Sequence, residues 1–402
     1  MLIEGGSDMV NRYIDCLVRT TFILLLTGLS ACTVVPEVES NRMPTSLLIH
    51  ESSFPKHKSL QLVNEQDIFA LNKEMRDFVH FNLLRIEDPK KRAEVLLEKL
   101  LNRSESMMVY NQGANLTAQQ TFEQRAANCL SLTILAYALA QEANLKINFQ
   151  EVKIPEYWVR QGDYNMLSRH VNLVVVGDSK TQFQTIWGNR ETTIDFDPYI
   201  VKKHFTREVI SKQRVTSMFY NNLGATALTQ ADFPLAYAYF KKAIQIDPEY
   251  SAVWGNLGFL YKIHQYENLA RESYLRAIKF DAGNYNAWNN LAILLKDQGE
   301  LKKSEEISEF IANIRASNPY YYAVLADEAY HQGNYQEAIS QYNKASKMQP
   351  NEDQFYFGLA KTYMKLGDYE LGEKYLNKAK EVADFPDVQQ RYAQKLRLLS
   401  KI

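Results

Sequence analysis

A spacing of 34 residues runs through the C-terminal half of this 402-residue chain. An aromatic residue marks each interval, and a leucine follows it three positions later. The aromatic positions are Tyr220, Trp254, Trp288, Tyr322 and Tyr356, and the leucines are Leu223, Leu257, Leu291, Leu325 and Leu359. A period of this length is typical of a two-helix unit that buries its apolar face by stacking on its neighbours. The period therefore predicts an all-α solenoid of five units: 217–250, 251–284, 285–318, 319–352 and 353–386.

Small residues support this interpretation, because paired helices must approach each other closely. They follow the leucines as Gly224, Gly258, Ala292, Ala326 and Ala360. The pattern resembles the tetratricopeptide repeat over five copies, and the third copy departs from it at Ser308, Ile311 and Ala316. Residues 387–402, with a helix expected at 388–399, would cap the last apolar face.

The tetratricopeptide resemblance implies a concave surface that binds a peptide or a protein partner. By analogy with the family, the inward-facing positions on the first helix of each pair include Asn221, Phe259, Lys262, Asn289, Lys296, Tyr320, Phe357 and Lys361. Their mixed polar and aromatic character suits a peptide ligand. The alternative for each single residue is a solvated helix face.

The N-terminal residues have the features of a targeting segment. The apolar run 20–29 is too short to span a bilayer and has the length of a signal-peptide core. It leads into Leu29-Ser30-Ala31-Cys32, which resembles the lipobox of bacterial lipoproteins. The resemblance implies that residues 1–31 are a signal peptide and that acylated Cys32 anchors the chain to a membrane. An ordinary secretory signal with an accidental cysteine is the alternative.

The residues after Cys32 predict where the anchored chain lies. Lipoproteins retained in the inner membrane often carry Asp after the acylated cysteine, whereas this chain has Thr33. By that resemblance we expect an outer-membrane lipoprotein that faces the periplasm. Residues 32–63 contain Pro36, Pro44 and Pro55, and their composition predicts a tether.

Charge and cysteine content limit the ligands that the chain can bind and the groups that could react. The chain has 46 Lys and Arg against 47 Asp and Glu, so it has no electrostatic reason to bind nucleic acid. The sequence shows neither metal-ligand spacing nor a phosphate-binding glycine loop, and we expect no metal and no cofactor. Because Cys16 leaves with the signal peptide and Cys32 is acylated, Cys129 is the one thiol left free.

That thiol stands at the start of a predicted buried helix. No charged residue occurs between Arg125 and Glu142, and Asn128 is placed to cap the helix. Cys129 then falls in the first turn, where the helix dipole and unsatisfied N–H groups favour a thiolate. Alternating runs that predict antiparallel strands follow at 146–152, 169–176, 181–187 and 192–197.

Three short motifs in this middle region resemble the transglutaminase-like superfamily. They are Arg125-Ala126-Ala127-Asn128-Cys129-Leu130-Ser131, Arg169-His170-Val171 and Ile194-Asp195-Phe196-Asp197-Pro198. The resemblance covers about residues 65–205 and predicts an α+β domain at 64–208 ahead of the solenoid. It implies Cys129 as nucleophile, His170 as its base and Asp195 as the carboxylate that orients the imidazole. Alternatives stay open: a buried core cysteine, a strand histidine, and Asp197 in place of Asp195.

Two functions from different classes fit these features. The first is an envelope-bound thiol enzyme, a cysteine peptidase or transamidase acting on peptide amide bonds, with the repeats choosing the substrate. The second is a non-enzymatic scaffold lipoprotein for envelope machinery, in which the first domain is degenerate. The ordered Cys, His and Asp motifs favour the first.

Overall fold

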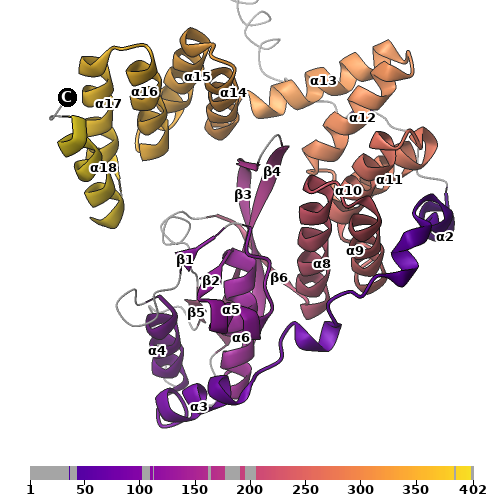
Figure 1. Cartoon of the computed structure of the whole chain (residues 1–402), viewed down its shortest axis with the longest axis vertical. Coiled ribbons are helices and arrows are strands. Elements are labelled where there is room, and N and C mark those ends of the chain that lie inside the picture. Colours follow the sequence, from indigo (N-terminus) through magenta and orange to yellow (C-terminus); the bar gives the residue numbers. More distant parts are fainter. Residues whose placement is uncertain are drawn as a thin grey trace, which may run out of the picture.

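The computed structural model describes Pro36 and residues 43–101, 109–111, 113–161, 164–176, 191–194, 205–383 and 386–399. The chain is mostly a helical solenoid, joined to a smaller unit that contains an antiparallel sheet (Figure 1). We call this unit, formed by the described residues of 64–210, the sheet domain.

The sheet domain packs helices against a four-stranded sheet of order β5-β4-β3-β6. The strands are β3 (Ile147–Gln161), β4 (Tyr164–Val176), β5 (Glu191–Ile194) and β6 (Arg207–Ile210), and all neighbours are antiparallel. The helices are α3 (Lys73–Asn82), α4 (Pro89–Leu101), α5 (Ala118–Gln124) and α6 (Cys129–Glu142), and short strands β1 (Val109–Tyr110) and β2 (Ala126–Ala127) pair in parallel. Tyr137 of α6 stacks on Phe149 of β3 with ring centroids 4.3 Å apart, which fixes the helix on the sheet. The strand predicted at 181–187 lies outside the described residues.

Strands β3 and β4 form a long hairpin. Val152 pairs with His170, and the register shifts before Tyr157 pairs with Ser168. Strand β6 pairs with β3 only at 149–152, and the described part of β5 pairs with β4 only at 173–176. The distal half of the hairpin, 157–168, therefore extends beyond the rest of the sheet as described.

The solenoid contains two helices in each predicted unit. They are α8 (Lys212–Thr229), α9 (Phe233–Ile246), α10 (Ser251–Ile263), α11 (Glu267–Phe280), α12 (Tyr285–Asp297), α13 (Leu301–Arg315), α14 (Pro319–His331), α15 (Tyr335–Met348), α16 (Asp353–Lys365) and α17 (Tyr369–Val382). A last helix, α18 (Pro386–Leu399), packs on α17. The small residues act as expected: a Cβ on Gly224 would lie 2.6 Å from the Phe240 ring, so the two helices of repeat one touch there.

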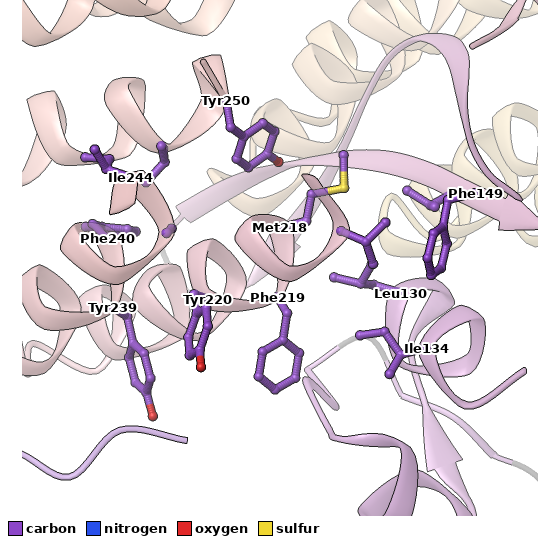
Figure 2. Packing of buried hydrophobic residues seen from close by; sticks show 14 of the residues in the cluster. Leu130, Ile134, Phe149, Met218, Phe219, Tyr220, Tyr239, Phe240, Ile244 and Tyr250 are labelled. Atoms are coloured by element: carbon purple, nitrogen blue, oxygen red, sulfur yellow. The ribbon is translucent and has the colours of Figure 1, made fainter. Parts of the chain in front are cut away.

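The sheet domain and the first repeat share one hydrophobic core. Figure 2 shows Met218 and Phe219 of α8 beside Leu130 and Ile134 of α6, and all four side chains are buried in the same cluster. Asn115 also donates a 3.1 Å hydrogen bond to the hydroxyl of Thr226. One side of α8 therefore packs on the sheet domain, while α9 covers another.

Residues 43–63, which we call the strap, differ from the predicted tether. They contain α2 (Thr45–Leu48) and the short helical turns η1 (Glu51–Ser53) and η2 (Pro55–Ser59), and they lie along repeats one and two. Phe54 stacks on Tyr237 at 4.9 Å and contacts His264 at 5.0 Å. The hydroxyl of Tyr261 donates to the Leu48 carbonyl at 2.5 Å. The composition of 32–63 suggested a loose tether, but these contacts hold 43–63 against repeats one and two.

The solenoid is interrupted between repeats three and four. The paired helices α9–α10, α11–α12 and α15–α16 pack on each other, whereas α13 and α14 lack comparable packing. The core that begins in the sheet domain ends at Ile311 and Ile314 of α13. The buried residues of α14 belong to separate clusters with α15 and α16. Figure 1 shows α14–α18 as a group of their own beyond α13.

Candidate functional site

A hollow of about 220 Å³ opens between the first helices of repeats four and five. Its lining combines aromatic and aliphatic side chains with one acid and one amine; the residues are Tyr320, Ala323, Val324, Asp327, Tyr342, Gln354, Phe355, Phe357, Gly358 and Lys361. Sites for peptides and small molecules are commonly concave and apolar with a few placed polar groups. The lining has this composition.

The polar part of the hollow is built on Asp327. Its Oδ1 accepts hydrogen bonds from the Tyr342 hydroxyl at 2.5 Å and from Lys361 Nζ at 2.7 Å. The Lys361 ammonium also lies 4.8 Å from the centre of the Tyr330 ring, within cation–π distance. Burial, and then the Asp327 charge, raise the pKa of Tyr342 far above its usual range. The hydroxyl therefore stays protonated and keeps donating.

The far wall of the hollow is fixed by a buried acid. Glu352 is 1% exposed, and its Oε2 accepts from the Tyr320 hydroxyl at 2.7 Å and from Gln349 at 3.2 Å. The Tyr320 ring meets Phe355 edge-on at 5.5 Å. On the floor, a Cβ on Gly358 would lie 2.3 Å from the Tyr342 ring, so only glycine fits there. The walls are therefore held in place before any partner arrives.

Of the eight predicted peptide-binding residues, the hollow brings together Tyr320, Phe357 and Lys361. The other five lie on repeats one to three. Asn221 is buried and accepts from Asn256 at 2.8 Å, and Lys262 pairs with Asp297 at 3.1 Å. Phe259 packs against the core, Asn289 is half-buried and Lys296 is exposed.

Seven of the ten lining residues were missed by the sequence argument, among them Asp327 and Tyr342, which form the polar part of the hollow. Asp327 stands 34 positions before Lys361, so the repeat period itself could have paired them. Tyr342 lies on the second helix of repeat four and packs on Gly358, and its hydroxyl donates to Asp327 at the hollow.

The thiol region is described in part. Cys129 is partly exposed at the first position of α6, and the Asn128 Oδ1 caps this helix by accepting from the Ser131 amide at 2.9 Å. His170 is 2% exposed on β4. The Thr133 hydroxyl lies 2.8 Å from the Cys129 carbonyl oxygen and 2.9 Å from that of Val171. It therefore holds the first turn of α6 beside the strand segment that carries His170.

The remaining predicted site residues lie outside the described part of the chain. These are Asp195, its alternative Asp197, and Cys32. The described residues contain no cluster of His, Cys, Asp or Glu that could hold a metal ion. In that same part of the chain, every helix is too short or too polar to cross a bilayer.

Comparison with known families decides the nature of the helical pairs. Two tetratricopeptide models match residues 219–250 and 273–306, within the first three units. The helical pairs are tetratricopeptide repeats. Proteins with such repeats bind peptide or protein partners. A further model, described as regulator of microtubule dynamics protein 1-3, matches residues 309–401.

Solved structures and curated proteins give similar matches. The crystal structure of MamA is 22% identical, covers 41% of this chain and 91% of its own, and has a TM-score of 0.24. YrrB, titled a tetratricopeptide protein with an unusual peptide-binding site, is 15% identical, covers 44% and 92%, and has a TM-score of 0.24. The ycf37 protein of Guillardia theta is 33% identical over 75 residues, or 19% of this chain and 42% of its own length. Protein bimA of Emericella nidulans is 26% identical over 115 residues, which are 29% of this chain and 14% of bimA. The matches thus span under half of either curated relative.

Proposed function

We propose that this chain is an interaction protein that binds an extended segment of a partner on the concave face of repeats four and five. One apolar side chain of the partner, aromatic or large aliphatic, enters the hollow. The observation that carries the proposal is the hollow itself, in which rings from α14, α15 and α16 surround one acid and one amine.

The charged pair gives the site a second kind of contact. The side chains of Asp327 and Lys361 are 45% and 30% exposed, so both reach solvent while they touch each other. A carboxylate accepts from peptide N–H groups and an ammonium donates to peptide carbonyls. An extended peptide backbone that crosses the hollow would offer an N–H to Asp327 and a carbonyl to Lys361. The partner's side chain, buried in the hollow, would supply most of the affinity.

The test is selection of random twelve-residue peptides, displayed on phage, against the full chain. We expect enriched peptides to share one large apolar residue and to lose binding at least tenfold with Ala323→Phe, which fills the hollow. Asn289→Phe is the matched control, because residue 289 occupies the same repeat position 34 residues earlier. Peptides that bind Ala323→Phe as well as the unaltered chain contradict the proposal.

We propose in addition that Cys32 is acylated and that the protein is a lipoprotein of the outer membrane, facing the periplasm. The support is the lipobox-like Leu29–Cys32 after a short apolar run. Cys32→Ala is expected to give a soluble or uncleaved product that no longer takes up radiolabelled palmitate. Labelling that persists in this variant contradicts the lipid anchor.

Thiol chemistry on amide bonds is the second candidate function. The observation that favours it is Thr133, whose hydroxyl holds the turn of Cys129 and the strand of His170 together. In this proposal a transglutaminase-like triad of Cys129, His170 and Asp195 attacks a peptide or glutamine amide. Water as the second substrate gives hydrolysis, and an amine gives transamidation. The repeats would then present the substrate.

A further inference from the structure

The interruption between repeats three and four coincides with the three positions at which repeat three departs from the pattern. Position 27 of each repeat is Ala243, Ala277, Ile311, Ala345 and Ala379. The four alanines are fully buried. Helices can approach most closely over a small residue, and Ile311 adds branched bulk on the helix that should receive α14.

The second departure removes an aromatic ring from the second helix: Phe240 and Tyr274 hold this position in repeats one and two, where they pack on Gly224 and Gly258 of their own repeats. In repeat four, Tyr342 reaches forward and packs on Gly358 of α16 in repeat five. Repeat three has Ser308 at the same position, and its hydroxyl instead donates to Ser304 O within α13 at 2.7 Å. A serine is too short to reach a neighbouring helix, so repeat three lacks the ring that packs on a facing helix in repeats one, two and four.

The third departure changes the direction in which the chain leaves the helix. The second helices of the other repeats stop at Asp247, Asp281, Gln349 and Ala383, all with ψ between 86° and 126°. In repeat three the matching residue, Arg315, is still helical, and the cap is Ala316 with ψ −26°. Repeats one and four have a proline one position after the cap, which favours an extended residue before it. Repeat two has Ala282 at that position and still ends at the extended Asp281, so the helical Arg315 is particular to repeat three.

After this break, α14 contacts a different part of the molecule. It lies against β3 of the long hairpin. Figure 1 shows the distal end of the hairpin beside α14. The same hairpin carries His170 in β4, near its base.

We infer that residues 319–399 form a movable arm, hinged at 316–318, and that the β3–β4 hairpin is the stop that sets the arm's position. In a repeat array each unit is held by its neighbours, so a reduced interface couples the two sides less tightly. The contacts that cross here are local to the hinge: Arg315 lies 5.6 Å from the centre of the Tyr321 ring, and the Tyr322 hydroxyl donates to Ala316 O at 3.2 Å. Hinges are short segments that absorb backbone rotation between two packed bodies. The hollow lies on the arm, so a partner bound there, which rests on the proposed function, would act on the hairpin and through it on the strand of His170.

The experiment measures distances across the hinge by pulsed electron resonance on the full chain. Spin labels are placed at the exposed positions Lys296→Cys and Lys374→Cys, with the three native cysteines changed to serine. The matched control pair is Lys279→Cys with Lys296→Cys, which lies on one side of the hinge. We expect the distance distribution across the hinge to be at least about twice as broad as that of the control pair. Equal widths overturn the inference.

Two kinds of variant test the cause. Ser308→Tyr, Ile311→Ala and Ala316→Pro together restore the repeat pattern, and Ile311→Ala alone is used if the triple variant loses its helical circular dichroism. We expect the cross-hinge distribution to narrow toward that of the control pair, and an unchanged width overturns the assigned cause.

Shortening the hairpin tests the stop. A two-residue Asn-Gly turn replaces 158–167, between the paired residues Tyr157 and Ser168. We expect the distribution to broaden further, and an unchanged width refutes the role of the hairpin. None of these distances depends on a ligand, so failure of the hinge and failure of peptide binding remain distinguishable.

Discussion

Trp288→Ala tests two points: the register of the repeats, and the separation of the core that ends at α13 from the clusters of α14–α18. Trp288 is 1% exposed, meets Phe310 edge-on at 5.5 Å, and donates its indole N–H to Ala282 O at 3.0 Å. Removing a buried tryptophan side chain costs about 3–5 kcal/mol, which includes the cavity that it leaves. The lost hydrogen bond contributes about 1 kcal/mol of this, because water replaces only part of it.

Trp288→Ala should lower the free energy of unfolding on one side of the hinge only. Trp288 belongs to the core shared by the sheet domain and repeats one to three, whereas α14–α18 have separate clusters. We therefore expect urea unfolding, followed by hydrogen exchange in mass spectrometry, to show α8–α13 destabilised by about 3–5 kcal/mol and α14–α18 nearly unchanged. Tyr322→Ala, at the same position of repeat four, should give the reverse pattern.

The control is Lys296→Ala, an exposed change on the same helix, with an expected effect within about 0.5 kcal/mol. A loss below about 1 kcal/mol for Trp288→Ala would refute the packing argument. An equal loss on both sides of the hinge would refute the separation of the cores.

Three further predictions concern the strap and the thiol. Phe54→Ala should free the strap, so that trypsin cleaves at residues 56–58 at least tenfold faster, while cleavage elsewhere is unchanged. Lys241, and then Lys58, lower the pKa of Glu51 from 4.5 to about 2. Since the folded pKa is depressed, strap docking should be fully stabilised above pH 4.5 and should weaken as pH falls toward 2. Glu51→Gln should abolish this dependence when strap cleavage is measured with pepsin, which is active in this pH range. If Cys129 is the nucleophile, Cys129→Ala and His170→Ala should each abolish turnover of a glutamine-peptide substrate while folding stays intact. The double variant should then lose little more activity than either single variant. The enzyme hypothesis ends if Cys129 is alkylated no faster than free cysteine and Cys129→Ala keeps full function.

Sequence predicted the solenoid well because its contacts are local. Each repeat except the third packs closely on the next, so the spacing of Trp254 and Trp288 fixes both the helices and their register. The strap was misjudged for the opposite reason. Its prolines and polar residues are typical of a linker, and its order comes from Tyr237 and Tyr261, which lie about two hundred positions away in sequence.

The sequence predicted some residues of the candidate site but not where the site lies. Family analogy placed Tyr320, Phe357 and Lys361 on the inward face, and all three line the hollow. The sequence could not show that α8 packs on the sheet domain or that the hollow lies on repeats four and five. The departures in repeat three were visible as single residues. Their joint effect, the loss of packing between α13 and α14, depends on how these helices meet and is seen only in the structure.

The strap also constrains the order in which the molecule folds. The Leu48 carbonyl and its partner, the Tyr261 hydroxyl, are 213 positions apart, and Arg276 donates to the Met43 carbonyl. At roughly 5–20 residues per second of synthesis, the strap waits about 10–40 s for its docking surface to be made. Contacts between such distant residues also form slowly, because a long loop must close first. Phe54 and its neighbours are therefore buried long after they are synthesised, and until then they are open to chaperones and proteases.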